Sequence, residues 1–177
     1  MSWDYRIMSS TNRGGKRELQ DLYETPNYTI DSLLSVMDMD QFAYSNFLEP
    51  CKASGRIFDK IRTNGTKDFA ELNLGIDYLT TEFSHIDFII TNPPFSLAFE
   101  FLQKSLKESP SVYYLLRLNF LGSKRRKSFW QSNRPSHVLV LSKRPSFVNK
   151  KTDSTEYAWF CWDNHKAIQL PKGVNVL

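Results

Sequence analysis

The stretch Asn92-Pro93-Pro94-Phe95 has the residue types and the spacing to hold an aromatic amine. It directly follows a run of apolar and β-branched residues, Phe88–Ile90, which predicts a strand buried on both faces of a parallel sheet. The two prolines fix their φ angles and cannot donate hydrogen bonds to a neighbouring strand, so they form a stiff platform where the strand ends. In open α/β sheets, ligands bind at this carboxyl edge.

Such a platform could activate an amino group on an aromatic ring, which is a poor nucleophile because its lone pair is drawn into the ring. The Asn92 amide oxygen and the Pro93 carbonyl could accept the two N–H groups, which would turn the lone pair toward an electrophile. Phe95 could stack on the ring. The plain alternative is a Pro-Pro turn that closes a strand and carries no chemistry.

The elements that must position this motif follow from hydrophobic periodicity. A helix of about three turns is predicted from Pro26, with Thr25 as its N-cap. An amphipathic helix is predicted over 96–109. Further strands are predicted at 47–48, 67–72, 112–118, 137–141 and 157–162, the last of these being the final strand.

Acidic residues follow two of the predicted strands. Glu49 precedes the small-residue turn 50–55, which opens onto a helix as cofactor-binding turns do, although it lacks the GxGxxG pattern of nicotinamide dinucleotide sites. Glu49 is placed to bind a cationic or polar ligand end, and Gly55 allows a close backbone approach. Glu71, after the second strand, is placed to bind a ribose diol, and Asp77 is a second candidate for an adenosine ligand. Either could equally be an ordinary surface acid.

The net charge of +4 conceals an uneven distribution. Residues 1–116 hold 11 Lys and Arg against 16 Asp and Glu, whereas residues 117–151 hold ten Lys and Arg and no acid. Protein surfaces normally mix the two signs, so this block predicts a polyanionic partner. A solvated basic loop without a partner is the alternative.

Length and composition suit a single domain at 21–177, preceded by a flexible polar arm at 1–20 and carrying basic loops at 122–136 and 148–155. The chain contains no apolar stretch of membrane-spanning length and no signal segment, so we expect no membrane partner. Cys51 and Cys161 are far apart and lack metal-ligand spacing, and three histidines are scattered. We therefore expect reduced cysteines, no metal site and a cytoplasmic location.

In chain order, these motifs resemble the N6-adenine DNA methyltransferases that use S-adenosylmethionine, and most closely the short Dam-like enzymes of phages. The likeness covers residues 21–163. Asn-Pro-Pro-Phe is typical of amino-methylating enzymes as a group, and two later stretches narrow the resemblance to the phage type. The stretches that carry it are Glu24-Thr25-Pro26, Leu48-Glu49-Pro50-Cys51 with Gly55, Asn92–Phe95, Arg117–Ser123 and Leu141–Phe147.

The resemblance implies a Rossmann-like class I methyltransferase sheet of about seven, mostly parallel strands with helices on both faces. It implies that Asn92, Pro93, Pro94 and Phe95 are catalytic and act on an adenine flipped out of double-stranded DNA, with Phe147 stacking on the other face of the base. It implies S-adenosylmethionine as cofactor, held by Thr25, Pro26, Glu49, Pro50, Cys51, Gly55, Glu71 and Asp77. The implied DNA-binding residues are Arg117, Asn119, Lys124, Arg125, Arg126, Lys127, Arg134, Lys143, Arg144 and Phe147.

Kinship with phage enzymes implies a role in the cytoplasm of an infected bacterial cell, where methylation would shield phage DNA from host restriction. One departure from the family concerns the cofactor turn, where Lys52-Ala53 leaves one glycine fewer than usual. Two alternatives therefore stay open. The same platform could serve an RNA base or a protein side chain, or the fold could carry a catalytically weak nucleic-acid-binding protein.

Overall fold

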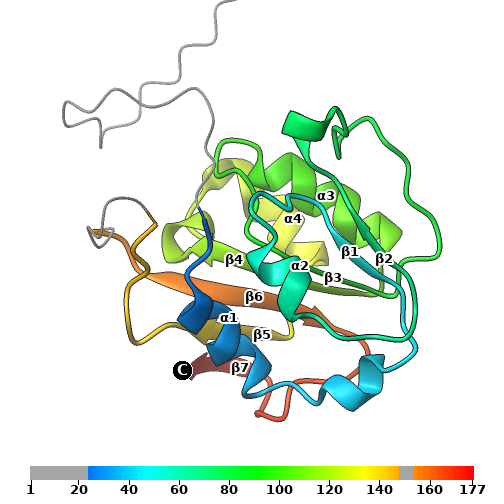
Figure 1. Ribbon diagram of the computed structural model, residues 1–177. Helices are drawn as coiled ribbons and strands as arrows, with labels where there is room; N and C mark the ends of the chain where they lie inside the picture. Colours follow the sequence, from blue (N-terminus) through cyan, green and yellow to red (C-terminus); the bar gives the residue numbers. More distant parts are fainter. Residues whose placement is uncertain (1–23, 148–153) are drawn as a thin grey trace, which may run out of the picture.

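A computed structural model describes residues 24–147 and 154–177 (Figure 1). Seven strands form one sheet in the order β2-β1-β3-β4-β6-β5-β7. Neighbouring strands from β2 to β4 are parallel, β7 is parallel to β5, and β6 is antiparallel to both β4 and β5. The strands are β1 (Phe47–Glu49), β2 (Lys67–Phe69), β3 (Phe88–Thr91), β4 (Ser111–Arg117), β5 (His137–Val140), β6 (Tyr157–Asp163) and β7 (Gly173–Val176).

Short helices connect the strands. The α-helices are α1 (Asn27–Leu34), α2 (Arg56–Lys60), α3 (Ala98–Glu108) and α4 (Lys127–Ser132). The 3-10 turns are η1 (Met39–Phe42), η2 (Leu72–Leu74), η3 (Leu118–Phe120) and η4 (Lys124–Arg126). This arrangement confirms the predicted Rossmann-like, mostly parallel sheet.

Alternate residues of the central strands build two cores, one on each face of the sheet. Phe47 and Phe88 pack with residues of α1 and α2 in the first core. Leu48 and Ile89, their immediate neighbours in sequence, pack with α3 and the aromatic residues of α4 in the second core. Because side chains alternate along a strand, the continuous apolar runs seen in the sequence supply both faces at once.

A buried hydrogen bond fixes the helix nearest to the start of the described chain. The indole nitrogen of Trp159 in β6 donates to the carbonyl oxygen of Thr29 in α1 over 2.8 Å. Ile30 and Leu33, on the same helix, are fully buried against the sheet. The position of α1 over the sheet is therefore set by both apolar packing and a directed polar contact.

Two predicted elements, the first helix and the last strand, need correction. Pro26, with ψ of 138°, is extended and caps α1, so the helix begins at Asn27 and Thr25 is not its N-cap. The Thr29 hydroxyl donates to the Pro26 carbonyl over 2.8 Å and closes the first turn. The strand at 157–163 is not the last, since Gly173–Val176 adds an edge strand whose exposed residues give little apolar signal.

The predicted basic loop at 122–136 is largely helical, because it contains η4 and α4. Phe129 and Trp130 of α4 pack on the second core, which holds this short helix in place. The predicted arm at 1–20 and residues 148–153 of the second predicted loop lie outside the described residues.

The described residues contain neither a membrane-spanning helix nor a cluster of metal ligands. None of their helices combines the length and the apolar character needed to cross a bilayer. Nor do His, Cys, Asp and Glu side chains gather there in a group that could hold a metal ion.

Candidate active site

The platform motif and the acidic turn lie at the same edge of the sheet. β1 and β3 are parallel neighbours, with Leu48 opposite Ile89. Glu49 is the last residue of β1, and Asn92 follows the last residue of β3. The chain runs outward from β1 to β2 on one side and from β3 to β4 on the other, so the strand order reverses between them. This is the topological switch point, where open α/β sheets bind ligands.

Two buried oxygen atoms at this edge are unsatisfied. Glu49 is 2 % exposed, and its Oε2 has no hydrogen-bond partner among the residues that the structure describes. The same holds for the hydroxyl of Thr91, at the end of β3. Burial raises the pKa of the Glu49 carboxyl well above its usual range, while the Phe58 backbone N–H and the Lys52 ammonium oppose that rise. Since buried polar atoms are rarely left unpaired, these oxygens mark a place where a ligand donor fits.

The turn after β1 keeps a backbone suited to glycine. Ala53 has a φ of 46° and Gly55 a φ of 85°, so both lie in the left-handed region. For Ala53 this costs about 1 kcal/mol. A hydrogen bond of 2.7 Å from the Ala53 N–H to Glu71 Oε2 holds the turn in this form. Ala53 thus adopts the backbone conformation that favours glycine, and the hydrogen bond from its N–H to Glu71 stabilises that conformation.

Both acids predicted to bind adenosine are engaged with backbone groups. The second Glu71 oxygen accepts from the Asn73 N–H at 3.1 Å. Asp77 Oδ1 accepts from the Leu79 N–H at 2.9 Å and starts a turn. Of the other predicted cofactor residues, Thr25, Pro26 and Pro50 are buried, and Cys51 is partly buried. Burial, together with the nearby Glu71 and Glu49 charges, raises the pKa of the Cys51 thiol to about 12.

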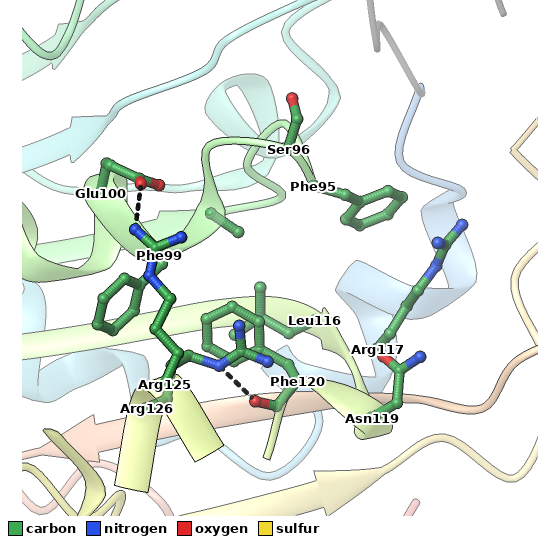
Figure 2. Close-up of a pocket in the computed structure, with 11 residues that line it drawn as sticks. Phe95, Ser96, Phe99, Glu100, Leu116, Arg117, Asn119, Phe120, Arg125 and Arg126 are labelled. Atoms are coloured by element: carbon green, nitrogen blue, oxygen red, sulfur yellow. Dashed lines mark hydrogen bonds and ion pairs between the residues drawn. The ribbon is translucent and has the colours of Figure 1, made fainter. Parts of the chain in front are cut away.

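Phe95 packs with the rings of Phe147 and Tyr157, and Arg117 lies beside it (Figure 2). The Arg117 guanidinium lies 4.6 Å from the centre of its ring and donates through Nε to the Tyr157 hydroxyl at 2.8 Å. The rings of Phe95 and Phe147 have centres 6.1 Å apart and are inclined at 74°. The two rings meet edge to face. The predicted stacking of a base between Phe95 and Phe147 needs parallel rings, so one of the two side chains would have to rotate. Arg117, predicted to bind DNA, contacts the platform aromatic in this structure.

A cavity of about 240 Å³ opens beside the platform, between the start of α3, the end of β4 and the turns η3 and η4 (Figure 2). It brings together the predicted catalytic residue Phe95 and four residues predicted to bind DNA. Among the described residues that line it, none is a predicted cofactor residue, and Asn92 is buried, at 7 % exposure, outside its wall. The lining residues are Phe95, Ser96, Ala98, Phe99, Glu100, Leu116, Arg117, Asn119, Phe120, Arg125 and Arg126.

Two neighbouring arginines of residues 117–151, the acid-free basic segment of the chain, differ in their surroundings. Arg126 donates through Nε to the Phe120 carbonyl at 2.9 Å, and its guanidinium lies 4.2 Å from the centre of the Phe120 ring. Burial, and then the neighbouring charge of Arg125, lower the pKa of Arg126. Arg125 is more exposed and lies 3.9 Å from Glu100, at the limit of an ion pair. Of these two arginines, Arg126 is held by the Phe120 carbonyl and ring, whereas Arg125 is the more exposed.

The other predicted DNA-binding residues fall into two groups. Lys124, Lys127 and Arg134 are on or next to η4 and α4, and they belong with the exposed or half-exposed surface of the basic segment. The loop after β5 instead packs against α1, where the Lys143 ammonium lies 4.7 Å from the centre of the Tyr28 ring. The carbonyl of Arg144 accepts from the Tyr28 hydroxyl, while its guanidinium pairs with Glu156. Phe147, from the same loop, contacts Phe95 at the cavity, so this loop reaches both α1 and the platform.

Sequence reasoning missed several residues that surround the platform. Ser96 directly follows the motif, Phe99 and Glu100 lie in the first turn of α3, and all three line the cavity. Their i, i+3 and i+4 spacing was a usable signal, because such residues are neighbours on a helix surface. Phe120 and the Tyr157 hydroxyl had no such signal, since their contacts depend on the fold.

The fold, a seven-stranded, mostly parallel sheet with helices on both faces, is that of the class I methyltransferases. Solved structures with that fold are similar to the chain across most of its length. A candidate RNA methyltransferase from Pyrococcus horikoshii aligns with a TM-score of 0.65 at 18% identity, covering 86% of this chain and 90% of that one. A candidate class I S-adenosylmethionine-dependent methyltransferase from Listeria monocytogenes aligns with a TM-score of 0.63 at 11% identity, covering 91% and 67%.

A third structure is the modification subunit of a candidate type I restriction enzyme from Vibrio vulnificus. It aligns with a TM-score of 0.55 at 16% identity over 84% of this chain, and the chain spans 45% of its length. No family model and no curated protein sequence matches the chain. At these identities the likeness establishes the fold, which agrees with the resemblance that the motifs carry.

Proposed function

We propose that this chain is a methyltransferase that uses S-adenosylmethionine to methylate the exocyclic N6 amine of adenine in DNA. The observation that carries the proposal is the pairing of two features at the switch point. The buried Glu49 carboxyl ends β1, and Asn92-Pro93-Pro94-Phe95 begins where the neighbouring strand β3 ends. The names of the structural neighbours support the same cofactor and class of reaction.

The residues at the edge of β1 fit a cationic cofactor. The unpartnered Glu49 Oε2 can accept from an ammonium group or a polar hydrogen, and Gly55 gives the turn room for a close approach. The cofactor would also contact the other predicted residues near the end of β1, which are Thr25, Pro26, Pro50 and Cys51. Glu71 and Asp77 would bind its ribose and adenine after exchanging their present backbone partners. When bound, S-adenosylmethionine supplies an electrophilic methyl group.

The residues at the end of β3 act on the acceptor amine. The Asn92 amide oxygen and the Pro93 carbonyl accept its two N–H groups and turn the nitrogen lone pair outward. Because Asn92 is buried, these hydrogen bonds form where little water competes, which strengthens them. Phe95 stacks on the base, held in place by Arg117. The adenine must leave the duplex to reach this edge, at a cost of a few kcal/mol.

Charge supports a nucleic acid as acceptor. Residues 117–151 hold ten Lys and Arg and no acid, and their turns η3 and η4 border the cavity next to Phe95. The name of the Vibrio neighbour favours DNA, and that of the Pyrococcus neighbour keeps RNA as the acceptor to compare. The phage-type motifs favour DNA, and in an infected bacterial cell such methylation would protect phage DNA from restriction.

The test is methyl transfer from tritiated S-adenosylmethionine to unmethylated DNA, to RNA and to cell protein in parallel. The matched variants are Asn92→Ala and Asn64→Ala, the second in an exposed turn between α2 and β2. We expect label in N6-methyladenine of DNA with the wild type and the Asn64 variant, and a loss of at least about a hundredfold with the Asn92 variant. Label confined to RNA or protein would refute the proposed acceptor.

One observation favours a second candidate, a nucleic-acid-binding protein with little or no turnover. Glu71 is bonded to the backbone of Ala53 and Asn73, so the acid after β2 is not free to receive a ribose without rearrangement. Calorimetry separates the two. Heat of binding for S-adenosylmethionine supports the methyltransferase, whereas DNA binding without cofactor binding supports the second candidate.

A further inference from the structure

The cavity beside Phe95 adjoins the proposed site of methyl transfer. Its walls come from the first turn of α3, from the end of β4 and from η3 and η4, and none of the described residues that line it belongs to the Glu49 turn. The proposed transfer chemistry uses two of its lining residues, Phe95 and Arg117, and leaves the others without a role. The ligand of this cavity is therefore a separate question.

The size and the walls of the cavity suit one flat aromatic ring system. Three phenylalanines, Phe95, Phe99 and Phe120, line it. Its volume of about 240 Å³ is below the range of roughly 300–1,000 Å³ typical of sites for drug-sized ligands. It can hold one nucleobase but is too small for a whole S-adenosylmethionine. Aromatic side chains that receive single bases by stacking are common in proteins that bind single-stranded nucleic acid.

Three arginines and one carboxylate of the described residues line the cavity, a set that suits an occupant with both acceptor and donor groups. Among the described residues of its wall, Glu100 carries the one carboxylate, and it faces Arg125 at 3.9 Å (Figure 2). A base edge presents donors and acceptors side by side, and a carboxylate next to a guanidinium matches such an edge.

Guanine matches this pair better than the other bases do. Its N1–H and N2–H₂ groups are adjacent and can be accepted by the two oxygens of Glu100, while its O6 and N7 accept from an arginine. Adenine and cytosine offer the carboxylate a single amino group beside a ring nitrogen that is itself an acceptor. Arg126, stacked on Phe120 and bonded to its carbonyl, is already held in place as part of the wall.

We propose that this cavity binds one unpaired guanine of the nucleic acid, next to the nucleotide that is methylated, and that Glu100 selects it. The inference rests on the proposed nucleic-acid acceptor. In a duplex, N1 and N2 of guanine are paired, so the cavity receives a base from a single-stranded or locally opened stretch. The preferred acceptor is then one in which a guanine near the target is unpaired.

The test measures binding of short oligodeoxythymidines by fluorescence anisotropy at one salt concentration. A single central position carries guanine, hypoxanthine, adenine or cytosine. Hypoxanthine retains N1–H, O6 and N7 and lacks only the N2 amine, so it isolates one contact with Glu100. We expect guanine to bind about fivefold or more tightly than hypoxanthine, adenine or cytosine.

Glu100→Gln is expected to remove this preference without weakening binding of the other oligonucleotides, because it removes a negative charge from the wall. Glu82→Gln, at an exposed acid outside the cavity, is the matched control and should keep the preference. Equal affinity for all four oligonucleotides, or an unchanged order in Glu100→Gln, overturns the inference while methyl transfer to DNA can still stand. Binding to none of them also overturns the inference, whereas the nucleic-acid acceptor is judged by the methyl-transfer assay.

Discussion

Replacing Glu49 with glutamine should change how stability depends on pH. The carboxyl is 2 % exposed, and its Oε2 lacks a partner within the described part of the chain. Burial raises its pKa in the folded protein well above the value of about 4.3 expected when the chain is unfolded. The folded state therefore keeps a proton that the unfolded state has lost. Glutamine has nearly the same shape as the protonated acid and does not titrate.

The magnitude follows from linkage. Below the unfolded pKa both states are protonated, so the contribution of this carboxyl to stability is complete. Between the unfolded and the folded pKa the folded state holds one more proton, and the free energy of unfolding falls by about 1.4 kcal/mol for each pH unit. Above the folded pKa the loss is constant. The Glu49→Gln variant lacks this decline, so at neutral pH it should be more stable than the wild type.

The assay is urea unfolding, followed by the fluorescence of the four tryptophans, at intervals from about pH 4 to about pH 8. Glu82→Gln, at an exposed acid, serves as the control and should follow the wild type. The raised pKa would be refuted if the free energies of unfolding of the wild type and the Glu49 variant changed equally with pH over this range. The same variant should bind S-adenosylmethionine more weakly by calorimetry, so added stability would accompany lost affinity.

Two further predictions concern Cys51 and the basic segment. With the Cys51 pKa raised to about 12, its thiolate fraction at pH 8 is about a thousandfold below that of a free cysteine. Alkylation of Cys51, measured by peptide mass, should therefore be slow until urea unfolds the chain. Fast labelling of the folded protein would contradict the burial of this thiol. Replacing Lys124 and Lys127 together with glutamine should weaken binding to every DNA sequence alike and reduce the slope of log K against log salt by about 2, as measured by anisotropy at several salt concentrations. An unchanged slope would exclude these lysines from phosphate contact.

Much of the fold could be predicted because its strongest signals are local. Phe88–Ile90 and the β4 run are continuous and apolar, which indicates strands covered on both faces, and they lie within β3 and β4. Proline after a strand and small residues before a helix mark chain reversals by the geometry of single residues. Where the apolar pattern is weak, the sequence does not predict the element. It gives no strand at the exposed edge strand β7, and it predicts a loop where η4 and α4 lie.

The candidate site also combines features that the sequence predicts with features that it does not. The motif, the acids after β1 and β2 and the basic block are properties of consecutive residues, and the sequence alone determined where in the chain they are. It could not determine that Glu71 holds the Ala53 turn or that Phe147 meets Phe95 edge to face. Each of these contacts joins segments far apart in the chain. Their distances and angles depend on how the strands pair and how the loops pack.

The sequence by itself thus determined the class of sheet, the stiffness of the platform and the uneven charge. Only the tertiary structure decided which charged groups share a cavity and which are engaged elsewhere. Glu100 and Arg125 are 25 residues apart and carry no joint pattern, yet α3 and η4 bring them within 3.9 Å. The physical reason is that backbone preferences act between neighbours in sequence, whereas the environment of a side chain is set by whatever the fold packs against it.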